Sequence, residues 1–214
     1  MLSGMDLSQP LSTLAPTLDA EALTVLARTD TSLTGRGIAS LVRRGSRPGI
    51  QAVLNRLVEH GLVKAQPAGA ATLYRLNREH LLAEPLLAMV TASATLTSRI
   101  RDEIRSWDHP AVAAALFGSY ARGQAHARSD IDLFLVRPDG TDEDAPGWRA
   151  QVDSLEVHVR AWTGNALEVL EVDEREVAAM GARKDRLVEE LLSDALHLTG
   201  PQPRHLFRAR RSAR

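Results

Sequence analysis

The feature that most restricts the fold is a pair of apolar runs joined by a segment that begins with glycine. Ala111–Phe117 contains no polar side chain, which is typical of a buried strand. Gly118-Ser119 follows at once, and a second strand-like run begins at Ile131. Polar residues therefore gather where one buried strand ends and the next one starts. We expect a functional loop between these two strands.

Two acidic residues and a glycine–serine pair give this loop a specific chemistry. Ten residues separate Gly118-Ser119 from Asp130, and Asp132 lies two positions further on. Residues at i and i+2 of a strand share one face, so both carboxylates can bind the same cation. Mg²⁺ prefers oxygen ligands and shares them with nucleotide phosphates. Glycine lets a phosphate approach the backbone, while the Ser119 hydroxyl and the following N–H groups can bind its oxygens.

The same segment resembles the nucleotidyltransferase superfamily of the DNA polymerase β type, in its small bacterial form. The family pattern is Gly-Ser, about ten residues, and then acid–hydrophobic–acid–hydrophobic, which is here Asp130-Ile131-Asp132-Leu133. The resemblance covers residues 95–200. It implies a polymerase-β-like fold with a mixed sheet, a nucleoside triphosphate substrate and a two-metal Mg²⁺ site. It assigns catalysis and metal binding to Asp130, Asp132 and a third acid, and nucleotide binding to Gly118, Ser119, Arg122 and Ser129.

The family's third carboxylate lies on the next strand, expected over residues 166–172, where the sequence offers two candidates. Glu168 lies between Leu167 and Val169, where the family places its acid, and we prefer it. Glu171 is nearer the end of the strand. Strict alternation gives both faces of this strand a mixture of apolar and acidic side chains, so periodicity leaves both glutamates open. The resemblance implies that this acid accepts the proton of the attacking hydroxyl or orients the second metal.

The front of the chain predicts three short helices followed by a hairpin. Residues 18–27, 33–42 and 46–60 have the helical spacing of apolar side chains, and residues 62–76 read as two short strands and a turn. The turn Ser46-Arg47-Pro48-Gly49 separates the second helix from the third, and Ser46 is a suitable N-cap for the third helix. This layout resembles a winged helix-turn-helix domain over residues 17–80, a family that includes many bacterial transcription regulators.

The winged-helix resemblance implies that double-stranded DNA is a partner. A recognition helix needs hydrogen-bonding side chains on its exposed face and basic neighbours that bind phosphates. Arg47, Gln51 and Asn55 are spaced four residues apart along the third helix. Basic residues before the helix and beside the hairpin complete the predicted set, which is Arg43, Arg44, Arg47, Gln51, Asn55 and Lys64. The alternative is a solvated face on a module used for protein docking or dimerisation.

The remaining segments predict connections and ends. Residues 81–107 read as one long linking helix, and residues 108–200 as the transferase domain. Residues 1–16 read as a loose N-terminus. Residues 201–214 carry five arginines and no acid, and they read as a disordered basic tail. The fold class expected for the whole chain is therefore α+β.

Composition excludes several other classes of protein. Cysteine is absent, which rules out disulfides, thiolate metal sites and a cysteine nucleophile. No apolar run is long enough for a membrane span, and the start of the chain lacks the pattern of a secretory signal. We therefore expect a cytoplasmic protein with no membrane partner.

Together these patterns predict a Mg²⁺-dependent nucleotidyltransferase that moves a nucleotide from a nucleoside triphosphate to a hydroxyl acceptor, with a DNA-binding front domain. The alternative is a transcription regulator or antitoxin-like protein, in which the transferase domain senses nucleotide or modifies a toxin-like partner. A homodimer is compatible with either function. The sequence does not identify the acceptor of the nucleotide.

Overall fold

The computed structural model describes residues 4–183 and 186–207, which divide into two compact units. The front unit is Gln9–Ser93. The rear unit combines residues 4–8 with residues 94–207. The division after Ser93 falls inside the segment predicted as a linking helix. Each unit is described by itself.

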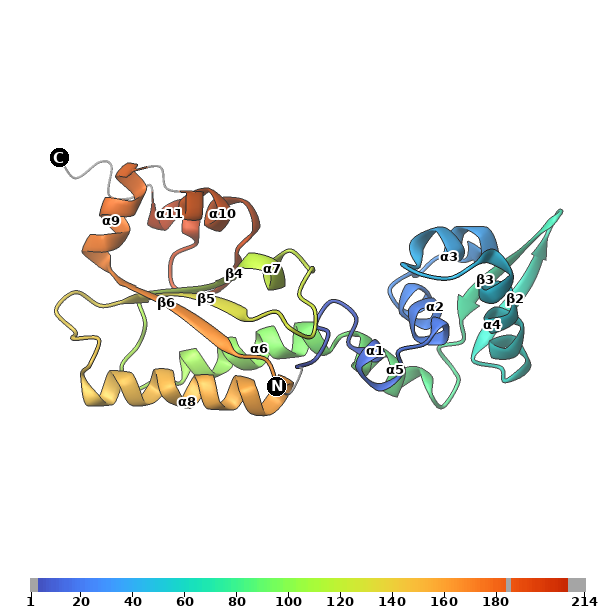
Figure 1. Ribbon diagram of the computed structural model, residues 1–214, viewed down its shortest axis with the longest axis horizontal. Helices are drawn as coiled ribbons and strands as arrows, with labels where there is room; N and C mark the ends of the chain where they lie inside the picture. Colours follow the sequence, from blue (N-terminus) through green and yellow to red (C-terminus); the bar gives the residue numbers. More distant parts are fainter. Residues whose placement is uncertain (1–3, 184–185, 208–214) are drawn as a thin grey trace. The chain divides into compact units, whose positions relative to one another are not determined.

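The front unit contains a small antiparallel sheet and a set of short helices (Figure 1). Its sheet has the strand order β1-β3-β2. The predicted helix over 33–42 begins instead with a two-residue strand that pairs with β3. The elements are α1 (Leu11–Leu14), α2 (Leu18–Ala27), β1 (Leu33–Thr34), α3 (Gly35–Leu41), α4 (Arg47–Glu59), β2 (Val63–Ala68), β3 (Ala71–Leu76) and α5 (Ala83–Val90).

Helix α4 forms for the reasons that its sequence suggests. The Ser46 side chain accepts a hydrogen bond from Gly49 N at 3.2 Å, which satisfies one of the unpaired N–H groups of the first turn. Ile50, Leu54 and Leu57 are buried in the core of the front unit. This apolar stripe fixes the orientation of the helix, so its polar stripe faces solvent.

The rear unit is built around a four-stranded mixed sheet with the order β6-β5-β4-β7. Strands β5 and β6 are parallel, and the other two pairs are antiparallel. The predicted mixed sheet is therefore confirmed. The elements are α6 (Ala92–Arg105), β4 (Ala113–Phe117), α7 (Gly118–Ala121), β5 (Ile131–Arg137), α8 (Pro146–Thr163), β6 (Leu167–Asp173), α9 (Glu174–Arg183), α10 (Arg186–Asp194), β7 (Leu196–Thr199) and α11 (Pro203–Leu206).

Helices cover both faces of this sheet, with α6 and α8 on one side and α9, α10 and α11 on the other (Figure 1). Strand β5 shows the alternation that this requires. Leu133 and Leu135 pack toward α6 and α8, whereas Phe134 and Val136 pack toward α9–α11. We refer to these as the α8 face and the α10 face. Because β5 is buried on both faces, its sequence is a nearly continuous apolar run.

Three expected features of the connecting and terminal segments differ in the structure. The helix predicted over 81–107 is two helices, because Thr91 leaves the helical conformation between α5 and α6. Residues 4–16 of the predicted loose N-terminus are ordered, since Leu7 is buried in the rear core and Leu11 in the front core. The basic tail is packed as far as Phe207, which is buried on the α10 face. The predicted disorder of residues 208–214 lies outside the described residues.

Within the described part of the chain, none of the helices combines the length and the apolar character that crossing a membrane requires.

Candidate functional site

The turn at Gly118 brings the main chain against Asp132. Gly118 has φ +66°, a conformation that side-chain-bearing residues rarely adopt. A Cβ atom at Gly118 would lie 2.8 Å from Asp132 Cγ and closer still to its carboxylate. Phe117 and Asp132 are register partners in β4 and β5, which explains the approach. Glycine is therefore required here both by the backbone conformation and by the neighbouring acid.

Asp132 lies on the α10 face of the sheet. It has the same parity along β5 as Phe134 and Val136, which pack in the cluster on that face. Asp130 precedes β5 with the same parity, and it is exposed. The prediction that the two aspartates share one face agrees with this register.

The register between β5 and β6 separates the two candidate third acids. Asp132 is paired with Glu168, and Leu170 and Val172, which share the parity of Glu168, pack on the α10 face. Glu168 is exposed there. Parallel neighbours in a sheet are about 4.8 Å apart. Glu168 therefore lies beside Asp132, as the preferred assignment requires.

Glu171 lies on the opposite, α8 face and is already engaged. Its carboxylate forms an ion pair with Arg137 and accepts a hydrogen bond from Trp148 Nε1 at 2.8 Å. Both members of the ion pair are only 11% exposed. Glu171 has a structural role and points away from the aspartates.

The electrostatics of Asp132 indicate a cluster of negative charge. Burial raises the pKa of Asp132 above its ordinary value, and the charges of Asp130 and Glu168 raise it further. Arg122 acts in the opposite direction. A group of acids that destabilise one another's charge favours a bound cation.

The donor set suits Mg²⁺ bound together with a nucleotide. Among residues 4–183 and 186–207, no three His, Asp or Glu side chains are gathered closely enough to hold a metal by themselves. Mg²⁺ generally keeps several waters and binds through one or two carboxylates and the phosphates of its substrate. Asp130, Asp132 and Glu168 supply hard oxygen ligands of this kind on one face.

The other predicted nucleotide-binding residues surround the same turn. Arg122 forms an ion pair with Asp194 of α10, with 3.9 Å between Arg122 Nη1 and Asp194 Oδ2. Ser119 O accepts a hydrogen bond from Gln124 N, and Ser129 Oγ accepts one from His126 N at 3.0 Å. The structure thus places Gly118, Ser119, Arg122 and Ser129 along the loop between β4 and β5.

Sequence reasoning missed the contribution of α10 to this site. Glu190 raises the pKa of Asp132, and Asp194 pairs with Arg122. A helical pattern of apolar side chains does not reveal which strand residue the charged face of the helix approaches.

The front unit presents the predicted polar stripe on α4. Arg47, Gln51 and Asn55 are exposed. Gln51 Nε2 donates to Asn55 Oδ1 at 2.8 Å and to the Tyr74 hydroxyl at 2.9 Å. These bonds link the helix to strand β3 and hold two amide side chains in fixed orientations at the surface.

A buried acid holds the basic loop before α4. Glu21 of α2 is only 5% exposed, and its carboxylate accepts hydrogen bonds from Arg43 N at 2.8 Å and Arg44 N at 3.2 Å. The Arg44 side chain also pairs with it at 3.4 Å. Sequence reasoning missed this role of Glu21, because a bond spanning more than 20 residues leaves no local pattern.

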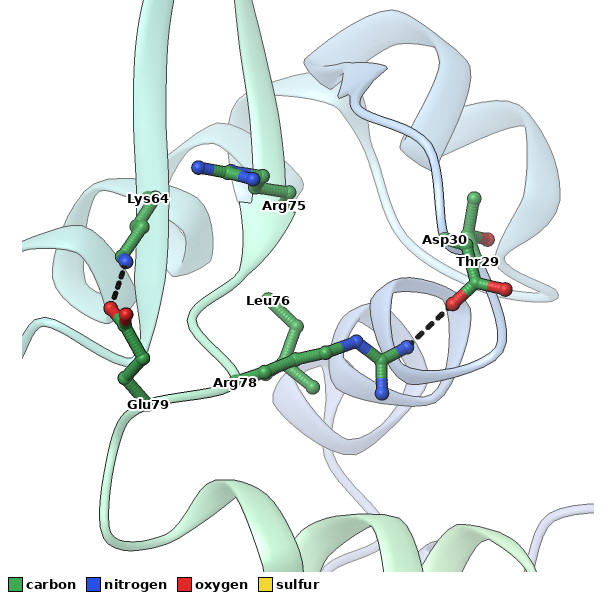
Figure 2. Close-up of a pocket in the computed structure, with 7 residues that line it drawn as sticks. All are labelled: Thr29, Asp30, Lys64, Arg75, Leu76, Arg78 and Glu79. Carbon is green, nitrogen blue, oxygen red and sulfur yellow. Dashed lines mark hydrogen bonds and ion pairs between the residues drawn. The ribbon is translucent and has the colours of Figure 1, made fainter.

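The predicted DNA contact Lys64 lies in a hollow of about 300 Å³ on the hairpin (Figure 2). Lys64 and Arg75 are register partners, so their side chains lie on one face. Figure 2 shows Lys64 paired with Glu79 and Arg78 paired with Asp30. The pKa of Glu79 is lowered by its hydrogen bond to Lys64. The charge of Lys64 is thus already partnered within the front unit.

A match to a known protein family lies within the rear unit. Residues 98–193 match the family model described as a nucleotidyltransferase domain. No curated protein matches the chain. A solved toxin-antitoxin with AMP-PNP is similar, with 23% identity and a TM-score of 0.38 over 55% of this chain and 85% of that one.

Two further solved structures are similar at a comparable level. A mutant of the toxin-antitoxin MntA-HpeT has 22% identity and a TM-score of 0.36 over 53% of this chain and 81% of that one. TrmBL2, an archaeal chromatin protein described with a novel mode of DNA binding, has 14% identity and a TM-score of 0.30 over 83% of this chain and 75% of that one. At these scores the likenesses carry no argument. The family model matches residues 98–193, the segment that includes the Gly118 turn and its carboxylates.

Proposed function

We propose that the rear unit is an active, Mg²⁺-dependent enzyme that transfers a nucleotide from a nucleoside triphosphate to a hydroxyl acceptor. The observation that carries this proposal is the position of Glu168 beside Asp132, on the face that Gly118 approaches. A glycine turn beside three acids can hold phosphates and a cation together.

The proposed roles follow from where each residue lies. Gly118 and Ser119 bind the phosphates at the turn, and Arg122 pairs with the triphosphate tail. The acceptor oxygen forms a bond to the α-phosphorus, the bond to the β-bridging oxygen breaks, and pyrophosphate leaves. Glu168 receives the proton of the acceptor hydroxyl. Asp130 and Asp132, with Glu168, would hold Mg²⁺, which when bound neutralises charge on the phosphates.

A matched pair of variants tests the carboxylate assignment. Glu168→Gln is expected to lower the affinity for AMP-PNP in the presence of Mg²⁺ about tenfold, without loss of stability. Glu171→Gln leaves Arg137 buried without its charge partner, so we expect about 3 kcal/mol of destabilisation and unchanged affinity. Calorimetric titration and thermal unfolding measure the two effects. The reverse pattern would assign the site to Glu171 and overturn the proposed geometry.

We further propose that the front unit is a winged helix-turn-helix that binds double-stranded DNA. The strand β1 and hairpin β2–β3 beside α3 and α4 support this fold assignment. The exposed stripe of Arg47, Gln51 and Asn55 supports a role for α4 in reading bases. Arg43, Arg44 and Lys64 would contact phosphates, and Lys64 would then have to exchange its bond to Glu79 for one to DNA.

An arginine pair provides the test of DNA binding. Arg43→Ala should weaken binding to duplex DNA of any sequence and reduce the dependence of log affinity on log salt by about 1 in slope, because Arg43 is proposed to contact a phosphate. Arg78→Ala, which removes an exposed arginine paired with Asp30, should have no such effect. Sedimentation of the complex would show whether a homodimer binds. Absence of binding at low salt would identify a docking module instead.

The alternative function is a regulator whose rear unit binds nucleotide without transferring it, or modifies a toxin-like protein. The same turn and carboxylates would bind the nucleotide in this case, so the two functions differ in whether transfer follows and in the acceptor. Nucleotide binding with no transfer to any acceptor would support the regulator. Transfer to a protein of a neighbouring gene would identify a protein acceptor.

A further inference from the structure

The segment at residues 4–8, here called the strap, runs along the loop that leads to Asp130. Gly4 N donates to Ala127 O and Ser8 N donates to Ala125 O, both at 2.9 Å. Leu7 between them is 3% exposed and belongs to the same core cluster as Ala125. The strap therefore binds the loop through both main-chain bonds and an apolar anchor.

Asn165 joins the strap to the residue before Asp130. This side chain is 4% exposed. Its Oδ1 accepts a hydrogen bond from Met5 N at 3.0 Å, and its Nδ2 donates to Ser129 O at 3.0 Å. Because the amide oxygen bonds the strap and the amide nitrogen bonds the loop, this buried side chain can hold both segments in a single arrangement.

The surroundings leave Asn165 little freedom to move. Its own N–H donates to Thr163 Oγ1 at 3.0 Å, at the end of α8. A Cβ atom at Gly4 would lie 2.5 Å from Asn165 Cγ, so the strap passes directly against the amide. On the other side, Ile131 N donates to Ala166 O at 2.9 Å. The start of β5 is thus tied to the residues around Asn165 by two bonds.

We propose that Asn165 and the strap are positioning elements that hold Ser129 and Asp130 in place for nucleotide binding. The effect on nucleotide binding rests on the proposed function, in which Asp130 is a metal ligand. Asn165 does not touch the substrate. It acts through Ser129 O, which belongs to the peptide bond that leads into Asp130. A displacement of about 1 Å in a reacting group can cost on the order of 100-fold in rate, so a small shift of this loop matters.

The variant Asn165→Asp separates the two bonds. It keeps the volume of the side chain and an oxygen acceptor for Met5 N, but it replaces the donor to Ser129 O with an acceptor. Asn165→Ala removes both bonds. Trp148→Phe is the matched control. It removes a different hydrogen bond, from Trp148 Nε1 to Glu171, near the other end of α8.

Two readouts distinguish positioning from general stability. Hydrogen exchange measures the protection of the amides of His126, Ser129 and Ile131, which lie in the loop and at its end. Calorimetry measures the affinity for AMP-PNP with Mg²⁺. We expect Asn165→Asp to speed exchange at these amides and to weaken nucleotide binding about tenfold. Trp148→Phe should destabilise the rear unit without either change.

A second perturbation, removal of residues 1–8, covers the case in which Asn165→Asp fails to fold. It is expected to speed exchange at the same three amides. Unchanged exchange in foldable variants of either kind would overturn the inference. If Asn165→Asp speeds exchange but the wild-type protein binds no AMP-PNP, the loop-holding role stands and the proposed function fails. If the wild type binds and Asn165→Asp binds equally well, the positioning role is wrong and the proposed function is unaffected.

Discussion

Replacing Gly118 with alanine tests whether the turn and Asp132 must approach each other. The added methyl group has two separate costs. The first is the positive φ, which costs an alanine roughly 1–2 kcal/mol. The second is the clash, because the new Cβ would lie 2.8 Å from Asp132 Cγ and nearer to its carboxylate. Either the turn or Asp132 must then move by about 1 Å, a displacement that can reduce a rate on the order of 100-fold.

A second glycine separates these two costs. Gly140, after β5, has φ +82° and no atom within 4 Å of the position of an added Cβ. Gly140→Ala therefore carries the conformational cost alone. Gly140→Ala should lose about 1–2 kcal/mol in the free energy of unfolding, and Gly118→Ala should lose more, because the clash with Asp132 adds to the same conformational cost. Only Gly118→Ala should lose affinity for AMP-PNP with Mg²⁺, by at least about tenfold.

Thermal unfolding and calorimetric titration, carried out on both variants, provide the assay. Equal affinities for wild type, Gly118→Ala and Gly140→Ala would refute the reasoning, because the approach of Gly118 to Asp132 would then be irrelevant to binding.

Two further predictions concern stability. Thr24 Oγ1 is a buried side-chain oxygen without a hydrogen-bond partner among the described residues, so Thr24→Val should stabilise the front unit by about 1 kcal/mol, measured by denaturant unfolding. Asp132→Asn should stabilise the rear unit at pH 7, because its raised pKa means that ionisation disfavours the folded state. This gain should disappear as pH falls below the ordinary pKa of an aspartate, about 4, which unfolding at a series of pH values would show. A gain that persists at pH 3, or a loss of stability from Thr24→Val, would contradict the respective argument.

Much of the local structure could be predicted because local patterns determine it. Helix α2 has the predicted bounds Leu18–Ala27, and α4 follows its N-cap Ser46 and its apolar stripe. The break at Thr91 could not be predicted in the same way. The apolar stripe continues through it, yet Val90 packs in the front core and Leu96 in the rear core.

The third acid shows where periodicity stops being informative. Strand β6 has apolar side chains on both faces, with Leu167 and Val169 toward α8 and Leu170 and Val172 toward α10. Alternation therefore cannot identify the functional face of a strand buried in this way. The pairing of Glu168 with Asp132 is a non-local property, and only the register of the sheet reveals it.

The strap and Asn165 were missed for the same reason. Residues 4–8 have no regular pattern, and their order comes from bonds to a loop more than 100 residues away. Asn165 follows Gly164 at the end of α8, where an asparagine is common, so the local sequence does not single it out. Its two side-chain bonds depend on segments that the sequence does not bring together.

The most direct test of the central claim follows the label of a nucleoside triphosphate. Cell extract is incubated with Mg²⁺, the protein and a triphosphate labelled at either the α- or the γ-phosphate. We expect the wild-type protein to transfer the α-label to an acceptor and to release the γ-label as pyrophosphate, while Asp130→Ala does neither. Transfer by Asp130→Ala at the wild-type rate, or no transfer by the wild type from any nucleoside triphosphate, would contradict the proposal that these carboxylates form the active site of a nucleotidyltransferase.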